Sequence, residues 1–268
     1  MQLLISVAGP ADTRAALLGG ADVIDAKDPR HGALSPVTLH RLAAIRAAVG
    51  GARPLSAALG DAADEHAIAR AVAAAASLGL AFVKVGFAGV TREARARRLA
   101  VAAQRAAADV GTRLVLVAYA DWRRAQSLAP AQVLTVAAGA GAAGVLLDTA
   151  NKGAPLFTLE SPTCVAAWIA AAHAAGLFAA LAGGLCGPEF ARARALRADL
   201  VGVRGAACVG GRTGRVSQAR VAALRALAGA PSAPRVLARR GLFPQRHVEL
   251  PEIVGRDDEV LHAARERA

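Results

Sequence analysis

The chain has 268 residues, of which 55% are hydrophobic, and a formal net charge of +12 at pH 7. This apolar content excludes a disordered protein and is sufficient for the core of one large α/β domain or of two small ones. The basic charge permits nucleic-acid binding, but the arginines are spread along helical patterns and aromatic residues make up only 3% of the chain, which favours an enzyme with solvated helix faces.

The cysteines and the N-terminus indicate the compartment. Cys164, Cys186 and Cys208 are too far apart for a metal site and odd in number for a disulfide framework, so we expect reduced thiols. Neither the histidines nor the cysteines have metal-ligand spacing, and we expect no metal and no cofactor. The apolar N-terminus lacks the basic segment of a signal peptide, and no run of about 18 uncharged apolar residues occurs. These features predict a cytoplasmic protein without a membrane partner.

Eight short apolar segments alternate with helical patterns, which is typical of βα units in a parallel sheet. We expect strands near residues 2–7, 22–27, 54–59, 81–86, 113–119, 143–149, 177–183 and 199–205. We expect helices near residues 11–19, 36–49, 61–78, 91–110, 122–139, 161–175, 188–197 and 214–228.

Eight such units within about 230 residues predict an α/β protein with the (β/α)₈ TIM-barrel fold. A doubly wound open sheet is the alternative, but no G-x-G-x-x-G motif follows the first strand to support it. We expect a single catalytic barrel domain over residues 1–229. The Pro- and Arg-rich remainder, residues 230–268, is expected to be a C-terminal extension of unknown function.

Lysine is rare in this chain. Among 32 basic residues only Lys27, Lys84 and Lys152 are lysines, and each lies at or just after the end of a predicted strand. In TIM barrels the C-terminal strand ends carry the chemistry. A lysine that arginine does not replace is a candidate for a site that needs a neutral amine, because arginine does not deprotonate at biological pH.

Two acids accompany these lysines. Asp25 lies two residues before Lys27, so both side chains point into the barrel, and Asp148 ends the sixth strand four residues before Lys152. Cations and carboxylates gathered in one mouth shift each other's pKa values, which favours a neutral, nucleophilic amine on one lysine, with Lys27 as the candidate. The alternative is that these groups are ion pairs that close the strand ends.

Two stretches after the last strands predict an anion site. Gly183 and Gly184 follow the seventh strand, and Arg204 and Gly205 follow the eighth. Loops at these two places form the usual phosphate site of a TIM barrel, in which backbone N–H groups approach the ligand. The alternative is that the glycines only permit tight turns.

The stretches DAKDPRHGAL, VKVG, LLDTANKG and LAGGL, and VRGAAC followed one residue later by GGRTGRV, resemble those of the (5-formylfuran-3-yl)methyl phosphate synthase family. The resemblance runs from residue 2 to about residue 228. It implies a TIM-barrel lyase that condenses two molecules of glyceraldehyde 3-phosphate, with loss of one phosphate and two waters, in methanofuran biosynthesis. It further implies that Lys27 forms the Schiff base and that Asp25, Lys84, Asp148 and Lys152 are the other catalytic positions. The tail beyond about residue 230 has no counterpart in this pattern.

Two other functions remain open at this point. One is a different class I aldolase that acts on a sugar phosphate, and the other is a non-catalytic basic protein that binds nucleic acid. The expected partner is a small triose phosphate rather than a nucleic acid or a membrane. The sequence leaves open whether the protein forms a homo-oligomer.

Overall fold

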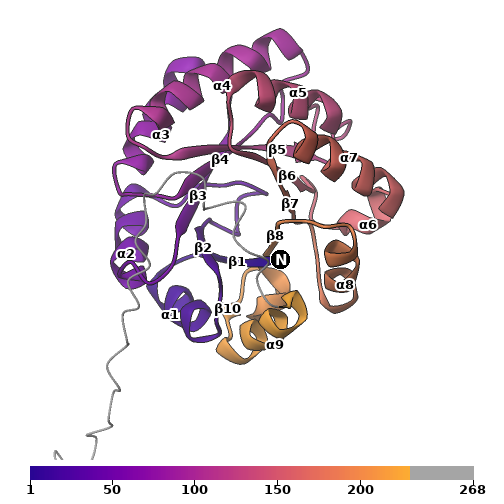
Figure 1. Cartoon of the computed structure of the whole chain (residues 1–268). Helices are drawn as coiled ribbons and strands as arrows, with labels where there is room; N and C mark the ends of the chain where they lie inside the picture. The colour runs from indigo at the N-terminus through magenta and orange to yellow at the C-terminus, as the bar shows by residue number, and fades with distance from the viewer. Residues whose placement is uncertain (230–268) are drawn as a thin grey trace, which may run out of the picture.

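The computed structural model of the chain describes residues 1–229, and these form a closed barrel of eight parallel strands surrounded by helices (Figure 1). The strands are β1 (Gln2–Val7), β2 (Val23–Ala26), β3 (Leu55–Asp61), β4 (Phe82–Gly86), β5 (Arg113–Tyr119), β6 (Gly144–Asp148), β7 (Phe178–Leu181) and β8 (Leu200–Val203). Each strand pairs with the next, and β8 pairs with β1 to close the sheet, with Leu3 opposite Val201. The predicted TIM barrel is confirmed.

The helices follow the strands in the order that the sequence predicts. They are α1 (Pro10–Leu18), α2 (Leu39–Val49), α3 (Glu65–Ala76), α4 (Glu93–Ala108), α5 (Pro130–Ala140), α6 (Leu156–Leu159), α7 (Pro162–Ala174), α8 (Gly187–Ala195) and α9 (Gln218–Ala228). Several begin at a side-chain cap: the Thr38, Asp64 and Ser161 side chains each accept a backbone N–H from the first turn of α2, α3 and α7, respectively.

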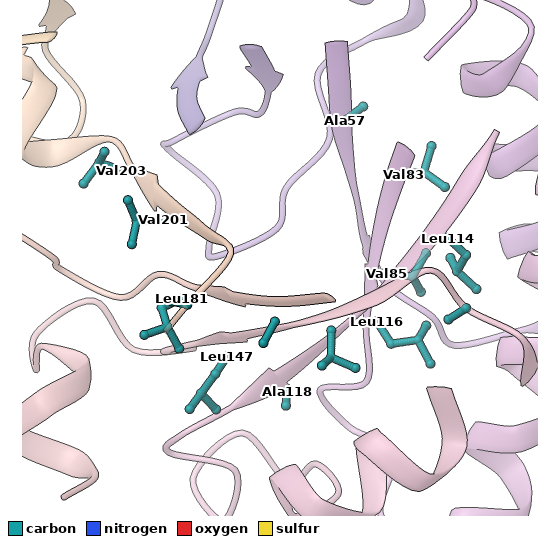
Figure 2. Close-up of a cluster of buried hydrophobic side chains, with 14 of the residues drawn as sticks. Ala57, Val83, Val85, Leu114, Leu116, Ala118, Leu147, Leu181, Val201 and Val203 are labelled. Atoms are coloured by element: carbon teal, nitrogen blue, oxygen red, sulfur yellow. The ribbon is translucent and has the colours of Figure 1, made fainter. Parts of the chain in front are cut away.

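The two faces of the strands have different roles, because successive side chains of a strand point to opposite sides. The outward-facing side chains, such as Val83, Val85 and Leu116, belong to the large buried cluster, part of which Figure 2 shows along strands β3 to β8. On β4 the residues that alternate with Val83 and Val85, namely Phe82 and Lys84, point into the barrel. The outward face therefore supplies packing, and the inward face is free to carry chemistry.

Four predicted helices begin at least three residues later than expected. The helices expected at residues 36–49 and 61–78 begin at Leu39 and Glu65. The helix expected at residues 122–139 begins at Pro130, because residues 121–127 form a series of turns in which Arg124 and Ala125 N–H groups donate to the Asp121 carbonyl. The helix expected at 214–228 begins at Gln218, because residues 208–216 form a short antiparallel hairpin of β9 (Cys208–Val209) and β10 (Arg215–Val216). A 3₁₀ turn, η1 (Gly205–Ala207), precedes this hairpin. The predicted extension, residues 230–268, lies outside the described residues.

Candidate active site

A cavity of about 380 Å³ opens at the end of the barrel where the strands end. Its inner wall is apolar, with Phe82 and Phe178 meeting edge to face at 6.1 Å between ring centroids. The polar residues come later on the same strands or in the loops after them, so they lie toward the mouth. The charged residues that line the cavity are Lys27, Lys84, Asp148, Lys152, Arg204 and Arg212. The structure thus brings the three lysines of the chain together at the mouth predicted for them.

Asp25 lies beneath the cavity and holds Lys84. The Lys84 ammonium donates to Asp25 Oδ2 at 2.7 Å, and the carboxylate also accepts the hydroxyls of Ser6 at 2.9 Å and Ser56 at 2.8 Å. Asp25 is fully buried and Lys84 is only 3% exposed. Asp25 does not line the cavity. The carboxylate therefore acts on the site through Lys84, whose charge it balances and whose position it sets.

Asp148 and Lys152 form the second ion pair. The Lys152 ammonium donates to Asp148 Oδ1 at 2.6 Å and also to the Thr149 carbonyl, and the Thr149 N–H donates to the same carboxylate oxygen at 2.7 Å. Burial opposes ionisation of Asp148, but the ammonium groups of Lys152 and Lys27 and the two hydrogen bonds more than offset it and lower the pKa of the carboxyl. Asp148 is therefore a buried carboxylate ion at neutral pH.

Lys27 differs from the other two lysines. Among residues 1–229 its ammonium has neither a hydrogen-bond acceptor nor a carboxylate within ion-pair distance. Burial and the neighbouring Lys84 ammonium lower the pKa of Lys27 from 10.5 to about 8, although Asp148 acts in the opposite direction. The ion-pair alternative therefore describes Lys84 and Lys152 but not Lys27. At pH 7 about one-tenth of Lys27 is neutral, against less than about one-thousandth for an ordinary lysine.

The predicted phosphate loops lie together at the same mouth. Gly183, Gly184 and Gly205 all line the cavity. Gly183 and Gly184 have φ of +94° and +70°, and a Cβ on Gly183 would lie 2.8 Å from the Thr149 side chain, so glycine is required there for the turn itself. Within the described chain the N–H groups of Gly183, Gly184 and Gly205 donate no hydrogen bond, which leaves them available to an anion.

Arg204 is used differently from the prediction that it is a phosphate ligand. Its guanidinium donates to three backbone carbonyls, those of Ser6, Arg212 and Gly214, and to Asp12 Oδ2 at 2.7 Å. Four of the five N–H groups of this side chain are therefore satisfied by the protein. These contacts fasten the β9–β10 hairpin to β1 and α1, and they leave at most one donor for a ligand.

Sequence reasoning did not single out Arg212 or Asp121. Arg212 lines the cavity, and its guanidinium donates to the carbonyls of Pro29 and Gly32 in the loop after Lys27. The Asp121 carboxylate accepts the N–H groups of Ala150 at 2.7 Å and Asn151 at 2.8 Å, which fixes the loop that carries Lys152. The GGRTGRV stretch that contains Arg212 is one of the motifs that carry the family resemblance, but the sequence assigned no role to this arginine, and no motif marks Asp121.

The described residues contain no group of three or more His, Cys, Asp or Glu side chains that could hold a metal ion. Within the same residues, no helix combines the length and apolar character needed to cross a bilayer.

Comparison with known proteins identifies the family. The family model described as 4-HFC-P synthase matches residues 3–225. The chain belongs to this family. It is 35% identical to the (5-formylfuran-3-yl)methyl phosphate synthase of Methanocaldococcus jannaschii over 85% of this chain and 99% of that protein. It is 38% identical to the synthase of the same name from Methanopyrus kandleri over 77% of this chain and 89% of that protein. The resemblance seen in the sequence is confirmed.

Solved structures support the fold of this family member. Orotidine 5′-phosphate decarboxylase from Pyrococcus horikoshii aligns with a TM-score of 0.60 at 14% identity, covering 85% of this chain and 99% of that one. A 3-hexulose-6-phosphate synthase aligns with a TM-score of 0.53 at 17% identity, covering 83% of this chain and 99% of that one. At these identities the likeness concerns the barrel alone.

Proposed function

We propose that this chain is a (5-formylfuran-3-yl)methyl phosphate synthase that works through a Schiff base on Lys27. The reaction joins two molecules of glyceraldehyde 3-phosphate and releases one phosphate and two waters, which makes the enzyme a carbon–oxygen lyase of methanofuran-type cofactor biosynthesis. Membership of the 4-HFC-P synthase family supports the reaction. The observation that carries the mechanism is the contrast between one buried, unpaired lysine of lowered pKa and two lysines held in ion pairs.

The first step is attack of the neutral Lys27 amine on the aldehyde carbon of one triose phosphate. Loss of water then gives an iminium, whose positive charge makes the neighbouring C–H acidic. Removal of that proton gives an enamine, which either expels the phosphate from the next carbon or attacks the aldehyde of the second triose phosphate. Hydrolysis of the final iminium frees Lys27, so the water lost at this lysine is returned and the net loss remains two waters.

The ion-paired groups supply proton transfer and charge. Asp148, a carboxylate beside Lys27, is our candidate base for the C–H proton, and the Lys152 ammonium at 2.6 Å from it can return a proton to a departing hydroxyl. Lys84 contributes a buried ammonium that lowers the pKa of Lys27. Gly183, Gly184 and Gly205 offer N–H groups to a substrate phosphate.

The catalytic unit in this proposal is the barrel, residues 1–229, because every named group lies within it. We place the enzyme in the cytoplasm, since three free cysteines, two of them exposed, suit a reducing compartment. Two exposed arginines of α4 favour an enzyme over a nucleic-acid-binding protein, because Arg97 and Arg98 are paired with Glu93 and Glu65.

The test is incubation of the purified full-length chain with glyceraldehyde 3-phosphate, with mass spectrometry of the products and an assay for released phosphate. We expect one equivalent of a furan aldehyde phosphate for each phosphate released. A product that retains both phosphates would indicate a different class I aldolase. A salt-dependent gel shift on nucleic acid without triose phosphate turnover would replace the enzyme proposal altogether.

A further inference from the structure

Five cationic side chains line the cavity, and three of them are neutralised by a carboxylate. Lys84 lies 2.7 Å from Asp25, Lys152 lies 2.6 Å from Asp148, and Arg204 lies 2.7 Å from Asp12. Lys27 and Arg212 have no carboxylate within ion-pair distance among residues 1–229. The proposed function uses Lys27 as an amine. Arg212 remains as a permanent positive charge in the cavity wall, and Asp148 and Asp28 act on it only from beyond ion-pair distance.

The Arg212 guanidinium also has unused donors. One N–H of each terminal nitrogen donates to the loop carbonyls of Pro29 and Gly32, while Nε–H and the second N–H of each terminal nitrogen have no hydrogen-bond partner in the described chain. The side chain is half-buried. Donors of this kind on a planar, charged fork match the paired oxygens of a phosphate or a carboxylate.

The surroundings of Arg212 suit the same ligand. Its backbone lies next to η1, where an ideal Cβ on Gly205 would lie 4.0 Å from the Arg212 nitrogen. The N–H groups of Gly205 and Ala206 donate no hydrogen bond within residues 1–229, and both residues line the cavity with Arg212. Arg204 holds this arrangement in place by donating to the Arg212 carbonyl at 3.0 Å.

We infer that Arg212, rather than Arg204, is the side chain that binds a substrate phosphate monoester, together with the free N–H groups of the loops after β7 and β8. Arg204 is a positioning residue that holds the hairpin. The same guanidinium donates to the carbonyls of Pro29 and Gly32, in the loop that follows Lys27. Arg212 would therefore both bind the phosphate and hold the loop beside the nucleophile. This inference rests on the proposed function only for the identity of the molecule that carries the phosphate.

The test is a titration of the full-length chain with inorganic phosphate, followed by ³¹P NMR, for the wild type and for Arg212→Gln. We expect the affinity to fall by about tenfold or more, since the variant removes a charged donor from the anion. Arg215→Gln is the matched control, because Arg215 lies on the same hairpin, is exposed, does not line the cavity and makes the same change in net charge. We expect this control to bind phosphate within about twofold of the wild type.

Two outcomes would overturn the inference: unchanged phosphate affinity in Arg212→Gln, or an equal loss of affinity in both variants. If Arg212→Gln fails to fold by circular dichroism, Arg212→Lys carries the same comparison, because lysine keeps the charge but cannot contact the two loop carbonyls and a phosphate together. The titration needs no turnover. If the wild type forms no furan product but binds phosphate in a way that depends on Arg212, only the proposed function is wrong. If the wild type forms the product but Arg212→Gln binds phosphate as well as the wild type does, only this inference is wrong.

Discussion

The Lys84 ammonium lies 2.7 Å from a carboxylate oxygen of Asp25, and both side chains are almost completely buried. Water cannot screen either charge, so each buried charge is stabilised mainly by the opposite charge of its partner. The hydroxyls of Ser6 and Ser56 donate to the same carboxylate, so that three of its roughly four acceptor sites are filled within the protein. This pair places a fixed positive charge beside Lys27, where it helps to lower the pKa of the nucleophile.

Replacement of Asp25 by Asn should destabilise the barrel strongly, because Lys84 is left as an uncompensated buried cation. We expect the free energy of unfolding to fall by about 3–5 kcal/mol, measured by urea denaturation at pH 7. The double variant Asp25→Asn with Lys84→Met should recover more than half of this loss, because it removes the unpaired charge and fills the space with a side chain of similar volume. A single variant within about 1 kcal/mol of the wild type would show that the pair does not depend on mutual neutralisation.

Lys27→Arg should abolish the reaction while the fold persists. Arginine keeps the positive charge and much of the volume but cannot form an iminium. Borohydride reduction during turnover should attach a substrate-derived mass to the wild-type peptide that contains Lys27 and to no peptide of the variant, as read by mass spectrometry. Lys84→Arg and Lys152→Arg are the matched controls, and each should retain trapping on Lys27. Normal turnover by Lys27→Arg would disprove the covalent mechanism, and a label on another lysine would move the nucleophile.

The sequence predicted the barrel well because its signals are local and repeated. Each strand is a short buried apolar run, and the expected and observed limits coincide for β1 and β5. The positions of Lys27, Lys84 and Lys152 followed from the fold, since every parallel strand ends at the same side of the barrel. The hairpin of residues 208–216 was missed because its strands have only two residues each, too few to show an alternating pattern.

The partners of the charged groups could not be predicted in the same way. Arg204 was expected at the phosphate, yet three of its four contacts are to backbone carbonyls, and a backbone carbonyl leaves no mark in a sequence because every residue has one. Arg212 contacts Pro29 and Gly32, about 180 residues earlier in the chain. Such contacts depend on how loops from opposite ends of the chain meet after the barrel has closed.

Gly205→Val should raise the KM for glyceraldehyde 3-phosphate by about tenfold or more while changing the free energy of unfolding by less than about 1 kcal/mol. Gly205 is the best of the three loop glycines for this purpose, because Gly183 and Gly184 have positive φ and a side chain there would strain the backbone. Around an ideal Cβ on Gly205, the one atom within 4.0 Å in the described chain, chain neighbours aside, is the backbone nitrogen of Arg212. A larger side chain at this position therefore fits without a clash and extends toward the place proposed for phosphate.

The control for this variant is Gly187→Val. Gly187 lies at the start of α8, has no atom within 4 Å of an ideal Cβ and does not line the cavity. Its KM should stay within about twofold of the wild type. Equal KM values for the two variants, with both folded by circular dichroism, would remove the loops after β7 and β8 from the phosphate site.

The lowered pKa of Lys27 predicts that, as the pH rises, the activity increases while the stability gained by replacing Lys27 with an uncharged residue decreases. Only the neutral amine attacks, so the rate of iminium formation should rise tenfold per pH unit below about pH 8 and level off above it. The folded-state pKa lies below the ordinary value of 10.5, so between about pH 8 and pH 10.5 the unfolded chain holds a proton that the folded chain has lost. The free energy of unfolding therefore rises with pH through this interval, and below pH 8 the full destabilisation, of about 3 kcal/mol, is present.

Lys27→Met tests this relation without turnover. At pH 7 methionine should raise the free energy of unfolding by about 1–3 kcal/mol, because it removes a buried, unpaired charge that serves catalysis rather than stability. The difference between variant and wild type, measured by urea denaturation at several pH values, should shrink as the pH rises from 8 toward 10.5, since Lys27 itself becomes neutral there. Lys84→Met is the control and should destabilise the protein at every pH in this range, because it leaves Asp25 as a buried, unpaired anion. A Lys27→Met protein less stable than the wild type at pH 7 would mean that the Lys27 ammonium is held by favourable contacts and is not the strained amine that the mechanism requires.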